Sequence, residues 1–462
     1  MKKLFIVIFT IICSLSLVVL SGCSKDDGKT TVTFYHTMGA NLREVLDKYI
    51  VKFNEENPDI KIVHEQVGSY DDVRDQIITE LQAGRQPALA YCYPDHVASY
   101  LRSKKVVDLN EYINDPEVGL TADQIADFIE GYYAEGSQFG DDTKMYSLPF
   151  SKSTEVMYYN KTFFEENELA LPTHWFSVDE ADTTSMEYVI GTIKTIDPNS
   201  VPLGYDSEAN WFITMTEQLN TPYTAAATDV EDRFLFNDPS NVSFLKKFKT
   251  WYDNGWMTTQ LVYGGYTSGL FTNLKQTDGK ILRSYISIGS SAGATYQCPA
   301  KVGETYPFEV GIAPIPQADQ DNLKVISQGP SITMFKQKDE AVNDATWLFI
   351  KYLLTNANFQ AEFSMASGYV PVLKSAFEVP AYIDFLADAG YTKETIASLS
   401  AKVCMEQEDN YFTSPAFVGS TDARDEVGQL LVSVISAGKN ATDADINELF
   451  IDAVNKCITL NR

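Results

Sequence analysis

The chain between residues 31 and 96 alternates between strand-like and helix-like patterns, and this alternation constrains the fold more than any other feature. Short runs rich in β-branched and aromatic residues predict strands at residues 31–36, 60–67 and 88–93. After the first of them, apolar residues recur at steps of three and four from Leu42 to Phe53, which is typical of a helix with one buried face. This β-α-β-α-β-α order predicts a mainly parallel sheet with helices on both of its faces.

The segments that follow these predicted strands are candidate ligand loops. In open parallel sheets, ligands bind beyond the carboxyl ends of the strands, which here means residues 36–41, 68–72 and 93–96. They contain Tyr, His, Asp and Ser, which are groups that hydrogen bond to or stack on a polar solute. An alternative remains open for Asp71 and Asp95, because each carboxylate is also placed to cap the helix that follows it.

The N-terminus has the layout of a secretory signal. Lys2 and Lys3 precede an apolar run over residues 4–20, which is shorter than the roughly 20 apolar residues that a membrane span needs. The run ends in Leu-Ser-Gly-Cys at residues 20–23, which resembles a bacterial lipobox, so Cys23 is the expected site of lipidation. We therefore expect a lipoprotein signal peptide at 1–22 and a polar tether at 23–30. The alternative is an ordinary signal peptide with a chance cysteine.

The charge of the chain excludes one class of partner. Its 63 Asp and Glu residues outnumber its 36 Lys and Arg residues, for a formal net charge of −27. Nucleic-acid binding depends on Lys and Arg, so we expect no nucleic-acid partner. An acidic body suits a soluble protein that is held off an anionic membrane surface.

The remaining cysteines indicate neither a metal site nor a redox motif. Cys92, Cys298, Cys404 and Cys457 form no C-x-x-C pair and have no nearby histidine. We expect them to be buried free thiols, although their spacing leaves a disulfide open.

Five segments resemble, in the same order along the chain, motifs of the family 1 extracellular solute-binding proteins. Residues 146–161 contain an L-P-F element followed by a strand that ends in Tyr-Asn-Lys, as in the first interlobe crossover of that family. The other four segments are residues 53–60, 172–175, 311–316 and 367–372. The likeness is greatest to the glycerol-3-phosphate- and maltose-binding branch, whose members serve ABC importers.

The resemblance implies a type II periplasmic-binding-protein-like fold of two α/β lobes with the ligand cleft between them. Lobe one would take residues 31–149 and 316–368, and lobe two residues 150–315 and 369–462. A ligand that binds the closed arrangement better than the open one drives closure of such a cleft.

The resemblance also implies a set of ligand-binding residues. Tyr70 and Tyr369 match tyrosines of the family's motifs, and Trp211 resembles the cleft tryptophan of the glycerol-phosphate branch. Asp95 lies one position after Pro94, where that branch has an acid. The full set of expected ligand-binding residues is Tyr70, Asp95, Ser153, Trp211, Ser290, Ser291, Gly329 and Tyr369.

One departure from the glycerol-phosphate branch bears on the solute. That branch has an arginine near the position of residues 417–419, where this chain has Phe-Val-Gly. A guanidinium is a bidentate partner of phosphate, so its loss favours a neutral mono- or oligosaccharide. Glycerol-3-phosphate or a glycerophosphodiester remains the alternative, with Arg424 as a possible compensating arginine.

An enzymatic interpretation has little support in the sequence. Residues 289–293 satisfy the G-x-S-x-G pattern of a hydrolase, but that fold needs a histidine after the serine. The only histidines, at positions 36, 64, 96 and 174, all precede it and lack metal-ligand spacing.

We therefore predict a non-enzymatic, monomeric receptor without a cofactor or a metal, anchored by lipid on the outer face of the cytoplasmic membrane. Its predicted partners are a small polar solute and the permease subunits of an ABC importer. A surface carbohydrate hydrolase is a remote alternative, and a sensory or adhesion lipoprotein with the same fold is another.

Overall fold

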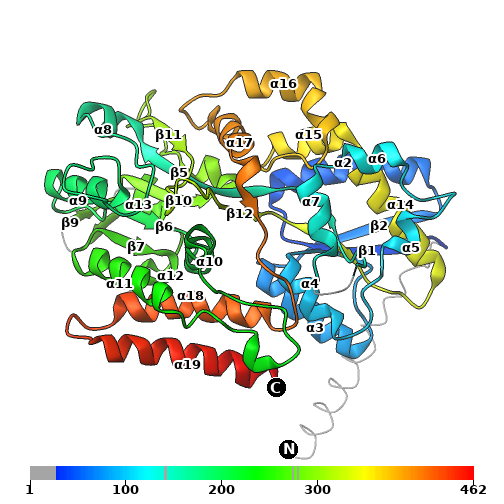
Figure 1. Cartoon of the computed structure of the whole chain (residues 1–462). Helices are drawn as coiled ribbons and strands as arrows, with labels where there is room; N and C mark the ends of the chain where they lie inside the picture. Colours follow the sequence, from blue (N-terminus) through cyan, green and yellow to red (C-terminus); the bar gives the residue numbers. More distant parts are fainter. Residues whose placement is uncertain (1–27, 140–142, 273–274, 278–279) are drawn as a thin grey trace, which may run out of the picture.

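The computed structural model describes residues 28–139, 143–272, 275–277 and 280–462. The predicted signal peptide and Cys23 lie outside these described residues. Figure 1 shows two lobes side by side, each built around its own β-sheet. We call them the first and second lobe, after the five-stranded and the seven-stranded sheet respectively.

The first lobe contains the sheet predicted from the N-terminal alternation. Its strand order is β2-β1-β3-β13-β4, in which β1, β2 and β3 are parallel and β13 is antiparallel to both of its neighbours. The strands are β1 Thr30–His36, β2 Ile60–Gln66, β3 Leu89–Cys92, β4 Leu148–Pro149 and β13 Ser331–Met334. The three predicted strands are thus confirmed to within one residue at each end.

Local signals explain where the helices of the first lobe begin and end. Helix α3 (Tyr70–Ala83) starts with a capping box, in which the Ser69 hydroxyl accepts from the Asp72 N–H and the Asp72 carboxylate accepts from the Ser69 N–H. It ends at Gly84, whose φ of 69° is a left-handed conformation that favours glycine. The other helices of this lobe are α2 Ala40–Glu56, α4 Pro94–Leu101, α5 Asn110–Ile113, α6 Ala122–Asp127, α7 Glu130–Ala134, α14 Glu340–Leu354 and α15 Ala357–Met365.

The second lobe is built around β5 (Ser153–Asn160), which pairs with β10, β11 and β12 and is antiparallel to all three. Val156, Met157 and Tyr158 in this strand are fully buried, because both faces of the sheet are covered. The remaining strands of the sheet are β6 Leu203–Tyr205, β7 Met257–Thr259, β10 Ile286–Ser290, β11 Val310–Ala313, β12 Val325–Gln328 and β14 Tyr411–Phe412. A separate hairpin pairs β8 (Lys275–Thr277) with β9 (Lys280–Leu282).

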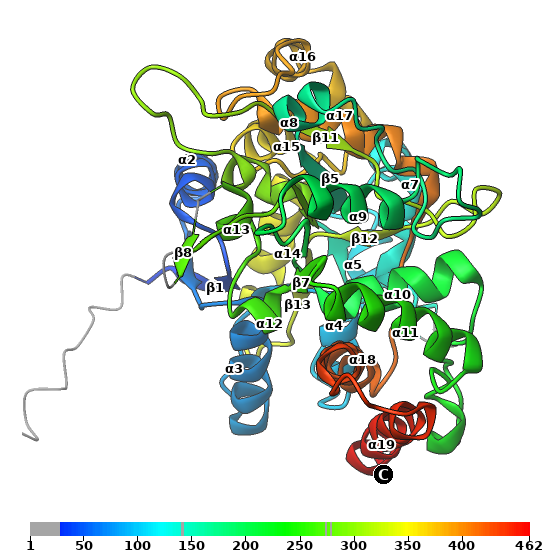
Figure 2. The same cartoon turned by 90° about the vertical axis from the view of Figure 1, so that its left-hand side faces the viewer.

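Long helices cover the second sheet. Helix α18 (Ser420–Ser436) packs against α10 (Glu208–Leu219) and α11 (Pro239–Asp253), and α19 (Asp443–Asn461) lies beside α18 on its outer side (Figure 2). The other helices are α8 Lys161–Glu166, α9 Met186–Ile196, α12 Gln260–Tyr263, α13 Ser268–Thr272, α16 Pro380–Ala387 and α17 Ile396–Glu406. Short 3-10 turns are η1 Glu135–Ser137, η2 Val230–Asp232, η3 Ser291–Gln297, η4 Lys374–Glu378 and η5 Glu408–Asn410.

The strand pairings move both later lobe boundaries from the predicted positions. The return to the first lobe was expected at residue 316, but Ser327 pairs with Thr154, so β12 belongs to the second sheet. The chain therefore crosses between β12 and β13, because the amino-terminal half of β5 needs a partner beyond the end of β11. Residues 370–375, expected in the second lobe, stay beside the first lobe, where Ser375 hydrogen bonds to Asp127.

The first two of the three crossovers that join the lobes touch each other backbone to backbone. Gly329, between β12 and β13, has a φ of 95°, and a Cβ there would lie 2.4 Å from the Ser151 carbonyl oxygen and 2.7 Å from Lys152 Cα. Next to this contact, Lys152 forms a buried ion pair with Glu135, and the Ser331 hydroxyl donates to the same carboxylate at 3.3 Å. The expected ligand contact Gly329 is therefore a position of close backbone approach.

We predict that Gly329→Ala destabilises the protein more than a matched substitution elsewhere. Gly264 is the control, because its φ of 81° is similar but no atom lies within 4 Å of a Cβ at that position. Gly264→Ala should cost about 1 kcal/mol of unfolding free energy from backbone strain. Gly329→Ala should cost roughly 2 kcal/mol more, because the methyl group also overpacks the crossover. Urea unfolding of both variants measures the difference, and equal costs would refute the close approach.

Candidate solute-binding cleft

A cleft of about 1130 Å³ lies between the two lobes and is lined by residues from both. From the first lobe come the amino-terminal ends of α3 and α4, which follow β2 and β3 as the parallel-sheet pattern predicted. From the second lobe come residues of β5 and β10 together with the amino-terminal ends of α10 and α18. The cleft is therefore a composite site that neither lobe forms alone.

Tyrosines line the first-lobe wall of the cleft. The rings of Tyr70 and Tyr93 are 4.5 Å apart, and the hydroxyls of Tyr70 and Tyr369 are 3.4 Å apart. Burial raises the pKa of all three phenols, so they remain protonated and able to donate hydrogen bonds at neutral pH. This wall combines apolar ring faces with hydroxyl donors.

Two further tyrosines on the second-lobe side are largely exposed. Tyr266 and Tyr296 line the cleft with relative exposures of 68% and 78%. Aromatic rings that are exposed at the wall of a concave site are available to stack against a ligand.

The floor of the cleft contains a buried carboxylate, Glu155, on β5. Its side chain accepts hydrogen bonds from the Tyr205 hydroxyl and, at 3.0 Å, from the Asn210 side-chain amide. Burial raises the pKa of Glu155 to about 7, although these hydrogen bonds and the charge of Arg424 act in the opposite direction.

Asp206 lies across β10 from Glu155. Its Oδ1 accepts from the backbone N–H of Thr267 at 2.6 Å and from the Thr267 hydroxyl at 2.7 Å, and its Oδ2 accepts from the Gln297 side-chain amide at 3.4 Å. Burial raises the pKa of Asp206 as well.

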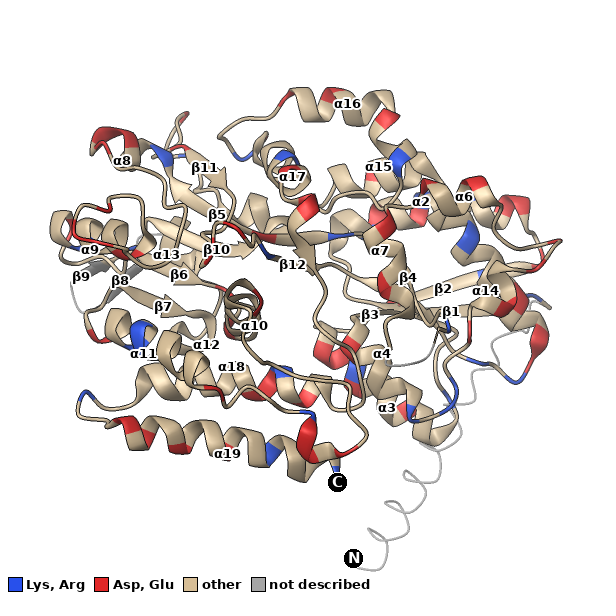
Figure 3. Ribbon diagram, viewed as in Figure 1, with Lys and Arg blue, Asp and Glu red and all other residues tan. Residues whose placement is uncertain are grey.

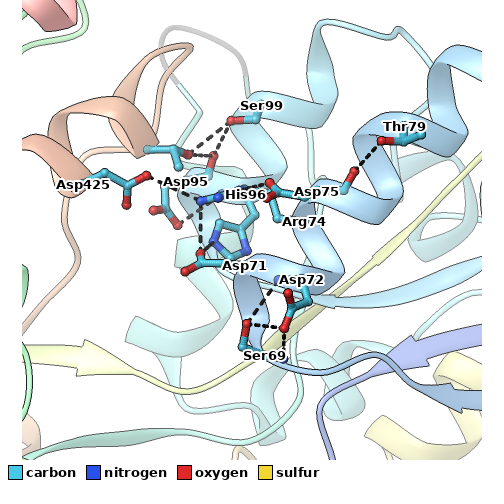
Figure 4. Close-up of polar contacts among 11 residues, drawn as sticks. Ser69, Asp71, Asp72, Arg74, Asp75, Thr79, Asp95, His96, Ser99 and Asp425 are labelled. Carbon is cyan, nitrogen blue, oxygen red and sulfur yellow. Dashed lines mark hydrogen bonds and ion pairs between the residues drawn. The ribbon is translucent and has the colours of Figure 1, made fainter. Parts of the chain in front are cut away.

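A cluster of charged residues joins the lobes at one side of the cleft (Figure 4). Arg74 of α3 lies 3.1 Å from Asp71 and 2.9 Å from Asp75 in its own helix, and 3.8 Å from Asp425 of α18. Burial raises the pKa of Asp425 to about 6, against the opposing charge of Arg74. Beside this cluster, the Thr421 hydroxyl of α18 donates to the Asp95 carbonyl oxygen at 3.0 Å.

Acidic groups outnumber basic ones along the described lining of the cleft. Figure 3 shows acidic residues where α18 faces the start of α4. Seven carboxylates, those of Asp71, Asp95, Glu135, Glu155, Asp206, Glu208 and Asp425, face only two arginines, Arg74 and Arg424. Both guanidinium groups are engaged, since Arg74 contacts its aspartates and Arg424 donates to Asn210 Oδ1.

Five of the eight predicted ligand-binding residues line this cleft. They are Tyr70, Asp95, Ser153, Ser290 and Tyr369. Their role as ligand contacts remains a prediction. Ser291, Gly329 and Trp211 do not line the cleft.

The side chain of Trp211 lies in the core of the second lobe, which corrects its placement at the ligand. The indole is fully buried between Tyr205, at a ring separation of 4.5 Å, and Phe248, at 4.0 Å. Although α10 begins at the cleft, Trp211 lies on the face of that helix that packs inward. Ser291 is also fully buried, and its hydroxyl accepts from the Thr154 N–H at 3.3 Å.

Several cleft residues were not predicted from the sequence. Glu155 lies two positions after Ser153 in the same strand, so strand alternation places both on one face and could have identified it. Asp206 follows β6 as Asp95 follows β3, at the carboxyl end of a strand. Tyr266, Tyr296 and Gln297 come from irregular or short elements that carry no such signal.

Three further observations concern the cysteines, metal-ligating residues and membrane-spanning helices of the described chain. Cys92, Cys298, Cys404 and Cys457 are buried free thiols, as predicted. The described residues contain no group of three or more His, Cys, Asp or Glu arranged to hold a metal ion. Within the described ranges, no helix has both the length and the apolar character of a membrane span.

The architecture and the interlobe cleft define a two-lobed solute-binding protein. The profile of the family described as bacterial extracellular solute-binding protein matches residues 48–389. The chain belongs to this family, whose members are extracellular or periplasmic, non-enzymatic solute-binding proteins of ABC transport.

Known relatives agree with this assignment. The chain is 24% identical over 362 residues to the sn-glycerol-3-phosphate-binding periplasmic protein UgpB of Escherichia coli K12, covering 76% of each protein. Among solved structures, UgpB from Mycobacterium tuberculosis in complex with glycerophosphocholine has a TM-score of 0.71 at 18% identity, covering 94% of this chain and 98% of that one. Lmo0181 from Listeria monocytogenes in complex with cycloalternan has a TM-score of 0.70 at 16% identity, covering 94% and 99%. These two structural likenesses show the two-lobed fold.

We predict that Glu155 makes the stability of the unliganded protein fall as the pH rises. The pKa of Glu155 is about 7 in the folded chain against a usual 4.5, so between these values the folded protein retains a proton that the unfolded chain has lost. Stability therefore decreases with rising pH in this window. Between pH values of about 4.5 and 7, wild type should lose roughly 3 kcal/mol more than Glu155→Gln.

Denaturant unfolding of both proteins across this pH range is the measurement. Glu304→Gln, at an exposed position, is the control and should follow wild type. Parallel curves for wild type and Glu155→Gln would contradict the buried, protonated carboxyl group.

Proposed function

We propose that this protein is the receptor of an ABC importer and captures a mono- or oligosaccharide by closing its two lobes around it. The observation that carries the proposal is the cleft of about 1130 Å³, whose tyrosine rings, hydroxyls and carboxylates come from both lobes. Because neither lobe holds all of these groups, a bound solute contacts more of the protein when the lobes are closed, and its binding favours closure.

The chemistry of the cleft suits a carbohydrate. A sugar ring has apolar faces that stack on aromatic rings such as those of Tyr266 and Tyr296. Its hydroxyls donate to carboxylates, which are acceptor-only groups, and accept from the phenols of Tyr70 and Tyr369. Solved relatives support the same class, since that from Listeria monocytogenes is in complex with cycloalternan.

Glycerol-3-phosphate or a glycerophosphodiester is the second candidate, because the relatives named UgpB are sn-glycerol-3-phosphate-binding proteins. The charges of the cleft argue against it. A phosphate needs free guanidinium or ammonium donors, whereas Arg74 is held by its aspartates, and the acids that line the cleft outnumber its two arginines, which disfavours an anion. Arg424 does not compensate for the absent arginine, because it donates to Asn210 and lies among these carboxylates.

Import also requires permease subunits in the membrane and a receptor that is held close to them. We propose that both lobes dock onto the permease subunits in the membrane, and that these subunits bind the closed arrangement of the lobes. Lipidation at Cys23 would hold the monomeric receptor on the outer face of the cytoplasmic membrane and raise its local concentration at the permease.

We predict that a carbohydrate, and not glycerol-3-phosphate, stabilises the protein in a thermal-shift screen of sugars, polyols and glycerol phosphates. A specific ligand at 100 times its Kd adds about 2.7 kcal/mol to the folded state, which is a readily measured shift. Solution scattering with the same ligand should show a smaller radius of gyration. A shift with glycerol phosphate alone would refute the carbohydrate assignment.

We also predict that Cys23→Ser releases the protein from the membrane, because the thiol that carries the lipid is then absent. In cell fractions, wild type should be found with the membrane and the variant in the soluble extracytoplasmic fraction. Cys92→Ser is the matched control, since Cys92 is buried in the fold and should leave the distribution unchanged. Membrane association of Cys23→Ser would contradict the anchor.

A further inference from the structure

Asp206 ties the segment that carries Tyr266 to the edge of the second sheet. Its Oδ1 accepts from the backbone N–H of Thr267 at 2.6 Å and from the Thr267 hydroxyl at 2.7 Å. Thr267 is fully buried, whereas its neighbour Tyr266 is 68% exposed and lines the cleft. Because the buried neighbour is held at two points, the carboxylate fixes the position at which the Tyr266 ring emerges into the cleft.

Small residues on the adjacent strands leave room for this tie. A Cβ at Gly204 would lie 2.5 Å from Thr267 Cβ, and one at Gly289 would lie 2.9 Å from Asp206 Oδ2. Gly204 pairs with Ser287 between β6 and β10, and the Ser287 hydroxyl oxygen lies 3.4 Å from that of Thr267. Side chains two positions apart along an extended chain share a face, so these residues lie on the same face as Asp206. Thr267 therefore packs into a space that larger side chains would close.

The other carboxylate oxygen of Asp206 holds the neighbour of the second exposed tyrosine. Oδ2 accepts from Gln297 Nε2 at 3.4 Å, and Gln297 is only 3% exposed. Tyr296, the preceding residue, lines the cleft and is 78% exposed. Each exposed tyrosine is thus next in sequence to a buried residue that donates to the same carboxylate. The hydrogen bond to Gln297 is the longer, so the tie on Tyr296 is the weaker of the two.

Tyr266 lies within electrostatic reach of the tyrosine wall of the first lobe. Burial raises the pKa of Tyr369, and the Tyr266 phenol raises it further. A sugar that stacks on Tyr266 therefore also lies near first-lobe hydroxyls that can hydrogen bond to it. A ring that is held in place before binding loses less conformational entropy when it stacks, which is worth about two- to tenfold in affinity for each side chain.

We propose that Asp206 is a positioning residue, which holds Tyr266 and Tyr296 in place before the solute arrives so that their rings stack on a sugar. The inference rests on the proposed function, because it concerns the second-lobe aromatic contacts of the same sugar site. It adds that the affinity for a sugar depends on a carboxylate that acts through these two tyrosines.

A double-mutant cycle tests the dependence on the tyrosines. Glucose, maltose, maltotriose, cellobiose and lactose are titrated by calorimetry into the full chain. Tyr266→Ala should weaken binding about tenfold through the lost stacking, and Asp206→Ala about fivefold because the rings are no longer held. In a chain that already carries Tyr266→Ala and Tyr296→Ala, Asp206→Ala should weaken binding by less than about twofold, because no ring remains to be positioned.

Two milder variants separate positioning from charge and from folding. Asp206→Asn keeps an oxygen that accepts from Thr267, so it should bind sugar within about twofold of wild type. Thr267→Val removes one of the two hydrogen bonds at nearly constant volume and should weaken binding about two- to threefold, again only while the tyrosines are present.

Asp445→Ala is the matched control. Asp445 Oδ2 accepts from the N–H of Thr442 at 2.7 Å and from its hydroxyl at 2.8 Å, which is the same pair of hydrogen bonds outside the cleft lining. This variant should keep the affinity of wild type for each sugar.

Hydrogen exchange gives a readout that needs no sugar. The amides of residues 264–268 should exchange faster in Asp206→Ala than in wild type, because the Thr267 N–H loses its acceptor. The same amides should exchange at the wild-type rate in Asp445→Ala.

The outcomes separate the two proposals. If a sugar binds and the effects of Asp206→Ala and the tyrosine variants add, or if Asp206→Ala changes neither binding nor exchange, the positioning inference is wrong and the carbohydrate receptor stands. A loss of affinity in Asp206→Asn as large as in Asp206→Ala also refutes it, since the charge and not the tie would then matter. If no sugar of the panel binds, the carbohydrate assignment fails and the positioning inference fails with it.

Discussion

The contact between the first two crossovers is the constraint on which the rest of the structure depends. At Gly329 the chain that returns to the first sheet passes directly over Ser151 and Lys152 of the outgoing crossover. The buried ion pair of Lys152 with Glu135 lies beside this point. Since β5 continues from the outgoing crossover and β12 leads into the returning one, this contact sets how the two sheets face each other. The shape of the cleft follows from it.

Tyrosine phenols line the walls of the cleft, and carboxylic acids line its floor. Tyrosine rings on both sides present apolar faces, and carboxylates such as Glu155 and Asp206 accept hydrogen bonds below them. Burial raises the pKa of both acids, because their surroundings disfavour the charged forms. A neutral solute that supplies hydrogen-bond donors suits these groups, whereas an anion does not. Solute selection therefore depends on the charge of the solute as much as on its shape.

The parts of the fold that the sequence could predict are those with local signals. The strands at residues 31–36, 60–67 and 88–93 and the end of α3 at Gly84 follow from periodicity and turn residues, and the first crossover follows from its motif. The return crossover was misplaced because the partner of β12 is β5, about 170 residues earlier, and no local pattern reveals that pairing. Trp211 was misplaced because its segment is buried on several sides, so the sequence does not show which way the indole points. Glu155 was missed although it shares a strand face with the predicted Ser153, because the rest of β5 is buried on both faces and its charged residue does not stand out as part of a polar pattern.

Glu135 belongs to two environments at once. One of its carboxylate oxygens is bound to Lys152 in the crossover, the other accepts from Thr413 at 3.4 Å, and the residue also lines the cleft. A solute that hydrogen bonds to this carboxylate would therefore change the charge balance at the crossover directly. In the proposed closure, one side chain would contact both the solute and the crossover, so no relay through the body of either lobe is needed between them.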